Sequence, residues 1–193
     1  MPLLLPASSH RRVPWRNGGG VTDEIAVQPD PCDPSRFAWR ISIATIGSAG
    51  PFSLFPGVDR ILLLVDGHGM LIRIGDGAWQ RIDRPFEPLD FAGEVPVDCR
   101  LIDGPVHDLN VMVDRMHWRA LVRTIRRPGD GVAGEAAAAR FLVAFHGTVR
   151  IGWGDTPFEL AHRDALRLDQ GEVWSIAELD AGASLVEVAL DPV

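Results

Sequence analysis

At 193 residues, 46% of them hydrophobic, the chain is long enough to bury a core as one domain or as two small ones. Its only cysteines are Cys32 and Cys99, which excludes a disulfide framework or a four-cysteine zinc site and favours a reducing compartment. Nineteen basic against 26 acidic residues give a net charge of −7, which opposes binding to nucleic acid. The apolar start, Met1 to Pro6, is too short for a membrane span and lacks a secretion-type cleavage site, so we expect a cytoplasmic protein without a membrane partner.

Two segments near the start, residues 21–27 and 37–46, alternate apolar with polar side chains. This alternation is typical of β-strands, because successive side chains point to opposite faces of a sheet. The polar faces of the two predicted strands collect Thr22, Glu24, Arg40 and Ser42.

A Gly- and Pro-rich turn at residues 50–57 leads into the apolar run Ile61–Val65, which is too short for an ordinary helix and predicts a strand. Asp66-Gly67 is a strong hairpin signal, so we expect residues 69–74 to pair with that run in a meander. Residues 107–113 predict a further strand, whose minority face carries Asp108, Asn110 and Met112.

The composition changes at residues 126–139, where Gly, Pro and a run of Ala predict a linker with room for one helical turn. Beyond it, residues 140–151 repeat the strand, His-Gly, strand pattern of residues 62–74. Almost every segment is a short strand bounded by turn residues, which predicts an all-β fold. We expect two barrel-like halves in one compact unit, residues 1–125 with the pocket and a smaller half at 126–193, between which strands can be exchanged.

The minority faces of the first-half strands mix two arginines with one carboxylate, small hydroxyls and apolar side chains. An antiparallel sheet commonly exposes one face to water, so alternating polar residues are often simply the solvent side. These strands contain no lysine, however, and the mixture suits a concave pocket that holds a small anion between apolar walls. We interpret this face as a candidate anion pocket.

Other chemistry has little support in the sequence. There is no Gly-x-Ser-x-Gly motif, and Cys32 lies in a Pro/Asp loop typical of an incidental thiol. The six histidines never fall at i, i+2 or i, i+4 spacing, and we interpret His68 and His146 as turn residues, with His107 a candidate for a pocket rim. The basic cluster from Arg119 to Arg127 is interpreted as a solvated face.

Four segments resemble the HutD/Ves family of cupin-like proteins: Pro14-Trp-Arg-Asn-Gly-Gly-Gly-Val-Thr-Asp-Glu24, Trp39-Arg-Ile-Ser42, Gly50-Pro-Phe-Ser-Leu-Phe-Pro-Gly-Val-Asp-Arg60 and Asp108-Leu-Asn-Val-Met112. The resemblance covers most of the chain, with its specific motifs within residues 14–112. It implies a bicupin fold, that is, two cupin-like antiparallel β-barrels or jelly rolls in one chain.

The same resemblance bears on metal binding. Metal-binding cupins hold a divalent ion with a His-x-His, a Glu and a later His, and the corresponding first three positions here are Ser53, Phe55 and Arg60. Phenylalanine offers no lone pair, and arginine cannot lose its proton to become a ligand. We therefore expect neither a metal nor another cofactor.

For function, the resemblance implies a small regulatory protein of histidine utilisation that binds intermediates such as urocanate or formylglutamate. We accordingly expect a non-catalytic module in which Arg40 and Arg60 bind the carboxylate of a small ligand, because a guanidinium meets a carboxylate through two hydrogen bonds. Residues Trp15 to Gly20 would fold across the mouth. No catalytic residue is expected, and the candidate ligand-binding residues are Trp15, Arg16, Asn17, Thr22, Glu24, Arg40, Ser42, Phe52, Ser53, Phe55, Arg60, Asn110 and Met112.

Three alternatives stay open. A cupin-type isomerase or hydrolase would use Glu24 as general base. The chain could instead belong with the stress-associated Ves branch. The third is a scaffold whose exposed barrel edges pair with a second copy to form a homodimer.

Overall fold

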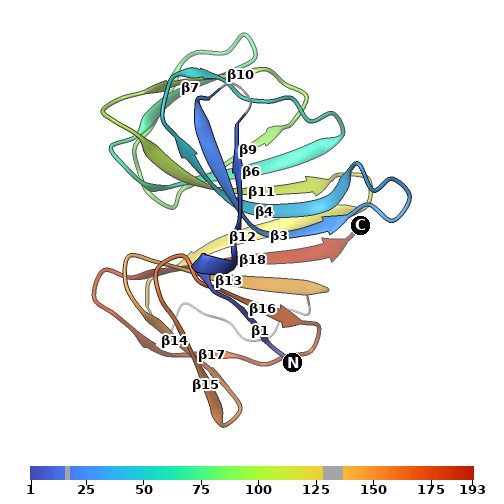
Figure 1. Ribbon diagram of the computed structural model, residues 1–193, viewed down its shortest axis with the longest axis vertical. Coiled ribbons are helices and arrows are strands. Elements are labelled where there is room, and N and C mark those ends of the chain that lie inside the picture. The colour runs from blue at the N-terminus through green and yellow to red at the C-terminus, as the bar shows by residue number, and fades with distance from the viewer. Residues whose placement is uncertain (16–17, 128–136) are drawn as a thin grey trace. The chain divides into compact units, whose positions relative to one another are not determined.

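The structure, a computed structural model, describes residues 1–15, 18–127 and 137–193. These residues form four antiparallel sheets and one short 3-10 helix, η1 (Ala7–Ser9) (Figure 1). The all-β prediction is confirmed. The candidate residues Arg16 and Asn17, and residues 128–136 of the expected linker, lie outside the described residues.

The chain divides into two compact units, Arg11–Trp118 with Val193, and Met1–His10 with Arg119–Pro192. This grouping differs from the expected halves, 1–125 and 126–193, at both ends of the first half. The first residues group with the C-terminal unit because β1 (Leu3–Leu5) pairs with β16 (Ala165–Asp169). Residues 119–125 also group with the C-terminal unit, because β12 (Trp118–Ile125) lies beside β18 (Ser184–Pro192).

The Arg11–Trp118 unit has a larger and a smaller sheet. The larger has six strands in the order β2 (Arg11–Pro14), β3 (Gly20–Pro29), β4 (Phe37–Ile46), β11 (Val106–Asp114), β6 (Val58–Asp66) and β9 (Pro88–Ala92). The smaller has the order β5 (Gly50–Pro51), β10 (Val97–Leu101), β7 (Met70–Ile74) and β8 (Gln80–Ile82). Its core draws on both sheets and includes Leu62, Leu64, Met70, Ile72 and Cys99.

The other unit repeats this design. Its larger sheet has the order β1, β16, β13 (Ala139–Phe145), β18 and β12, and its smaller sheet the order β15 (Thr156–Leu160), β14 (Val149–Trp153) and β17 (Ser175–Leu179). Its core again combines both sheets and includes Leu142, Val149, Ile151, Leu166 and Trp174.

The turn after β6 is not a hairpin, so the meander prediction is wrong at this point. β6 pairs with β11 and β9 in the six-stranded sheet, whereas β7 pairs with β10 and β8 in the four-stranded sheet. The Asp66-Gly67 signal marks a chain reversal that carries the backbone from one sheet to the other. Gly67 has φ +99°, and a Cβ there would lie 2.7 Å from the Pro105 carbonyl oxygen, so glycine is required.

The predicted repeat of this pattern is present in the second unit. β13 belongs to the five-stranded sheet and β14 to the three-stranded one, so the turn between them also changes sheets. His146 adopts a positive φ of 59° in this turn, in agreement with its interpretation as a turn residue.

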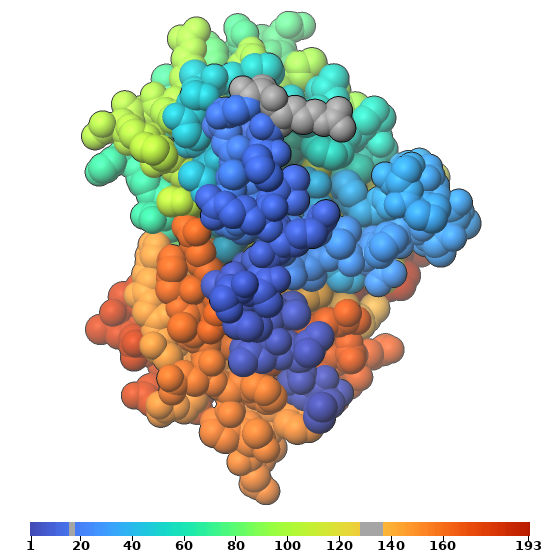
Figure 2. Space-filling model, viewed as in Figure 1, coloured from blue at the N-terminus to red at the C-terminus, as the bar shows by residue number. Residues whose placement is uncertain are grey.

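Strand β2 lies at the edge of the six-stranded sheet and is exposed along its whole length, as the blue segment of Figure 2 shows. Its register places Arg11 opposite Glu24 and Val13 opposite Thr22 on β3. The strand thereby brings side chains from the start of the chain to the polar face of β3. Within the described residues, no helix is long and apolar enough to cross a membrane.

Candidate functional site

A pocket of about 680 Å³ opens in the Arg11–Trp118 unit, over the face on which the sequence places its polar residues. Strands β3, β4, β6 and β11 supply Thr22, Glu24, Arg40, Ser42, Arg60 and Asn110. Trp15 and the segment after β5 supply the rest of the expected set, Phe52, Ser53 and Phe55. Of the candidates that the structure describes, only Met112 is absent from the lining.

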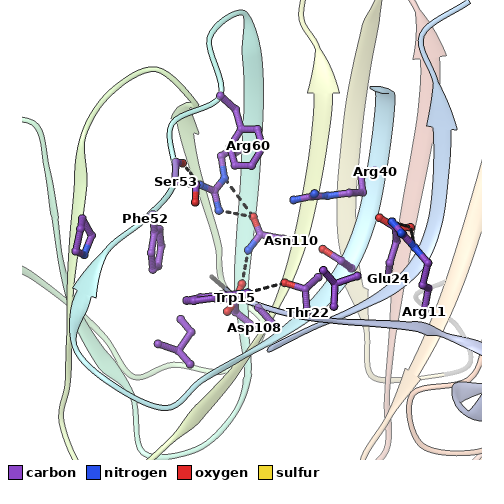
Figure 3. Close-up of a pocket in the computed structure, with 16 residues that line it drawn as sticks. Arg11, Trp15, Thr22, Glu24, Arg40, Phe52, Ser53, Arg60, Asp108 and Asn110 are labelled. Atoms are coloured by element: carbon purple, nitrogen blue, oxygen red, sulfur yellow. Dashed lines mark hydrogen bonds and ion pairs between the residues drawn. The ribbon is translucent and has the colours of Figure 1, made fainter. Parts of the chain in front are cut away.

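Arg40 and Arg60 lie on either side of β11. That strand pairs with β4 on one side and β6 on the other, and Met112 is the residue opposite both Arg40 and Arg60. Met112 is fully buried between them, so it supports the arginines rather than lining the wall. Figure 3 shows the Arg40 side chain extending toward the part of the pocket that contains Arg60 and Asn110.

Arg60 is held by a side-chain amide and by aromatic rings. Its Nε and Nη2 donate to Asn110 Oδ1 at 3.3 and 2.8 Å, and its guanidinium lies 4.8 Å from the centroid of the Phe91 ring. The side chain is only 7% exposed. Burial lowers the pKa of Arg60 to about 10, which still leaves it positively charged at neutral pH.

Arg40 has weaker protein partners. Nη2 donates to the Met112 sulfur at 3.0 Å, and the guanidinium lies 5.2 Å from the Phe37 ring centroid and 5.4 Å from that of Phe55. Among the described residues, Nε has no hydrogen-bond partner, and Arg40 makes no ion pair within 4.0 Å. Burial also lowers the pKa of Arg40, and the nearby charge of Glu24 only partly opposes this decrease.

Residues of β2 and β3, and Trp15 after β2, make further polar contacts at the pocket (Figure 3). Glu24 accepts from Arg11 Nε at 3.0 Å and lies 2.9 Å from Arg11 Nη2. Trp15 Nε1 donates to Thr22 Oγ1 at 2.8 Å, which fixes the indole at the pocket. Gly20 allows this close packing, since a Cβ there would lie 2.4 Å from the Thr45 carbonyl oxygen.

Sequence reasoning missed two charged residues of the lining, Arg11 and Asp108. Asp108 is 0% exposed, and Asn110 Nδ2 donates to its Oδ2 through a very short hydrogen bond. Burial raises the pKa of Asp108 to about 7, although Arg60 and the hydrogen bond from Asn110 oppose the increase. Its position two residues before Asn110 on the same strand face was a signal that could have found it.

Ser53, Phe55 and Arg60, at the positions of cupin metal ligands, all line this pocket. Residues 1–15, 18–127 and 137–193 contain no group of three or more His, Cys, Asp or Glu side chains arranged to hold a metal ion. The lining contains the arginines Arg11, Arg40 and Arg60, whose guanidinium groups are hydrogen-bond donors that suit an oxyanion.

Known proteins resemble this chain over nearly its whole length. Residues 7–186 match the HutD family. An uncharacterised 21.2 kDa protein of Pseudomonas putida, described as lying in the hutC 3′ region, is 31% identical over 185 residues, 96% of each chain. Protein Ves of Cronobacter sakazakii is 44% identical over 115 residues, 58% of this chain and 61% of that protein.

Solved structures agree with this assignment. HutD from Pseudomonas fluorescens SBW25 superimposes with a TM-score of 0.81 at 27% identity, and a conserved protein of unknown function from Pseudomonas aeruginosa PAO1 with 0.83 at 32%, each over the whole of both chains. A bacterial pirin from Escherichia coli, solved with nickel(II), shares the fold alone, with a TM-score of 0.66 at 13% identity over both whole chains. The expected bicupin fold is thus confirmed, and the chain belongs to the HutD family.

Proposed function

We propose that this protein is a non-catalytic, cytoplasmic module that binds a small carboxylate metabolite in the pocket beside Arg40 and Arg60, without a metal or other cofactor. The observation that carries the proposal is the partly buried guanidinium of Arg40, which has no ion-pair partner among the described residues and lies across β11 from the buried Arg60. A ligand carboxylate would supply the missing counter-charge and accept two hydrogen bonds from one guanidinium. Phe52 and Phe55 would exclude water around it.

The ligand proposed is an intermediate of histidine degradation, urocanate or formylglutamate, bound in a regulatory role. Support for this choice comes from relatives: the P. putida protein is described by its place beside hutC, and the P. fluorescens HutD structure is described as a formate condition. Both candidate ligands combine a carboxylate with a nitrogen-bearing group, for which Glu24 and Asn110 of the lining are the proposed polar partners.

Calorimetric titration tests this choice directly. We expect urocanate or formylglutamate to bind with a dissociation constant below about 1 mM, a modest affinity for one charge-assisted contact in a preformed pocket. Histidine serves as a comparison, because the arginines of the pocket repel its cationic amino group. If none of the three binds at millimolar concentration, the ligand assignment is wrong.

An enzyme of cupin type is the second candidate, and the geometry makes Glu24 a weak choice of base, because both its contacts above are with Arg11. Turnover of a histidine-pathway intermediate that disappears in Glu24→Gln would favour this candidate. A Ves-like role is the third, supported by the local identity to protein Ves.

We further propose a homodimer that forms through the edge strand β1. Leu3 and Leu4 of this strand are 53% and 40% exposed, and an exposed apolar edge favours pairing with a second strand. Sedimentation velocity at micromolar concentration should give a dimer for the wild type and a monomer for Leu4→Lys. A wild type that sediments as a monomer would remove this proposal.

A further inference from the structure

A chain of hydrogen bonds links the buried acid of the pocket to its buried arginine. Asn110 accepts from Arg60 through Oδ1 and donates to Asp108 through Nδ2, so one amide joins the two charges (Figure 3). The amide orientation is fixed at both ends, because only its oxygen can accept from the guanidinium and only its nitrogen can donate to the carboxylate. Asp108 is therefore the indirect counter-charge of Arg60.

One oxygen of this acid has no partner. Oδ2 accepts from Asn110, whereas Oδ1 is buried without a hydrogen-bond partner among the described residues. A buried carboxylate oxygen that lacks a donor destabilises the ionised form of the acid. A proton on Oδ1 would relieve this cost and leave the bond from Asn110 to Oδ2 unchanged.

Resting on the proposed function, we infer that a carboxylate that binds at Arg60 replaces Asp108 as its counter-charge, and that Asp108 takes up one proton from solvent on Oδ1 as the ligand enters. The anion and the proton enter together, so the net charge of the buried site stays constant. Asp108 acts through Asn110 and Arg60, as a positioning residue that couples ligand binding to pH.

The electrostatics of the site support this coupling. A second negative charge near Arg60 disfavours the ionised form of Asp108, whose pKa in the ligand-free protein already lies near 7. Cys99 on β10 faces the same acid, and burial raises the pKa of its thiol to about 12, so it keeps its proton throughout. The other charged groups of the pocket are Arg11, Glu24 and Arg40 on β2, β3 and β4.

The direction of the pH effect follows from these groups. Above about pH 7 the ligand-free protein has Asp108 ionised, while the complex holds it protonated, so affinity falls as pH rises, by up to ~10-fold per unit. Below that pH both states are protonated and affinity is flat. His107, the neighbour of Asp108 on β11, lies 3.5 Å from Asp66 and is a second ionisable side chain, so the test must separate the two residues.

Calorimetry with formylglutamate and with formate, both fully ionised from pH 6 to 8.5, provides the test. Titrations at pH 8 in Tris and in triethanolamine, cationic buffers of different ionisation enthalpy, measure the protons exchanged. The wild type should take up close to one proton per ligand.

Asp108→Asn, which keeps an acceptor for Asn110 and retains His107, should take up none and bind with an affinity independent of pH. Asp98→Asn removes a carboxylate on β10 that pairs with Arg73 at 2.5 Å and does not line the pocket, so this variant should behave as the wild type.

A second measurement uses the wild type alone and is unaffected if Asp108→Asn folds poorly. The carbon-13 carboxyl resonance of Asp108 should titrate near pH 7 without ligand and at higher pH with saturating formate. Ligand binding without proton uptake, a pH slope that persists in Asp108→Asn, or an unmoved resonance would overturn the inference while leaving the binding function intact. Absence of binding by any carboxylate would overturn both.

Discussion

Replacing Arg60 with alanine should weaken carboxylate binding roughly 30- to 700-fold, about 2–4 kcal/mol, the range for removing one partner of a desolvated charge pair. The effect is large because Arg60 is buried at 7% exposure and is oriented by Asn110 before any ligand arrives. Arg60→Lys should recover only part of the affinity, since an ammonium cannot reproduce the two parallel hydrogen bonds of a guanidinium. Calorimetry with formylglutamate measures both changes.

Arg84 provides the matched control for this prediction. It is an exposed arginine of the same unit, 3.5 Å from Glu87, and it does not line the pocket. Arg84→Ala should bind the ligand as the wild type does. If Arg60→Ala binds formylglutamate normally while circular dichroism reports an intact fold, the carboxylate contact at Arg60 is excluded.

Replacing Glu187 with alanine should destabilise the protein by about 3–5 kcal/mol, because it leaves a buried arginine without its counter-charge. Glu187 is 1% exposed on β18, between β13 and β12. Arg140 Nε on β13 lies 2.9 Å from its Oε1, and Arg123 on β12 donates to Oε2 from Nε and Nη2 at 3.0 and 2.7 Å. One carboxylate therefore compensates two arginines within the sheet.

Urea denaturation of wild type and variant measures this cost. Glu178 is the control, because it pairs with Arg150 in the same unit but both side chains are largely exposed. Glu178→Ala should leave the denaturation midpoint nearly unchanged, as solvent screens such pairs. Equal midpoints for Glu187→Ala and the wild type would mean that the buried triad contributes nothing to stability.

The same triad corrects one interpretation of the sequence. The arginines from Arg119 to Arg127 suggest a solvated face, yet the Arg123 guanidinium makes two hydrogen bonds to a buried carboxylate of β18. Glu187 lies 64 residues farther along the chain. No local pattern relates the two, since their pairing depends on which strands become neighbours.

The sequence by itself determined the strands and the face on which the pocket residues lie. Alternation is a local property of the backbone, because side chains on a strand point to opposite sides whatever the partner strand is. It placed Arg40, Ser42 and Asn110 on one face, and the structure finds all three in the pocket lining. The mixture of arginine and apolar residues favoured a pocket over a solvent face, whereas the absence of lysine carried no information, because the whole chain contains none.

Only the tertiary structure decided which strands pair and in what register. The Asp66-Gly67 turn signals a reversal, but whether β6 and β7 pair depends on distant strands that compete for their backbone hydrogen bonds, and here β11 and β10 are the partners. That register puts Met112 between two arginines, removes it from the lining, and sets Asn110 between Arg60 and Asp108. The role of Asp108 is likewise tertiary, because burial rather than residue type brings its pKa to about 7.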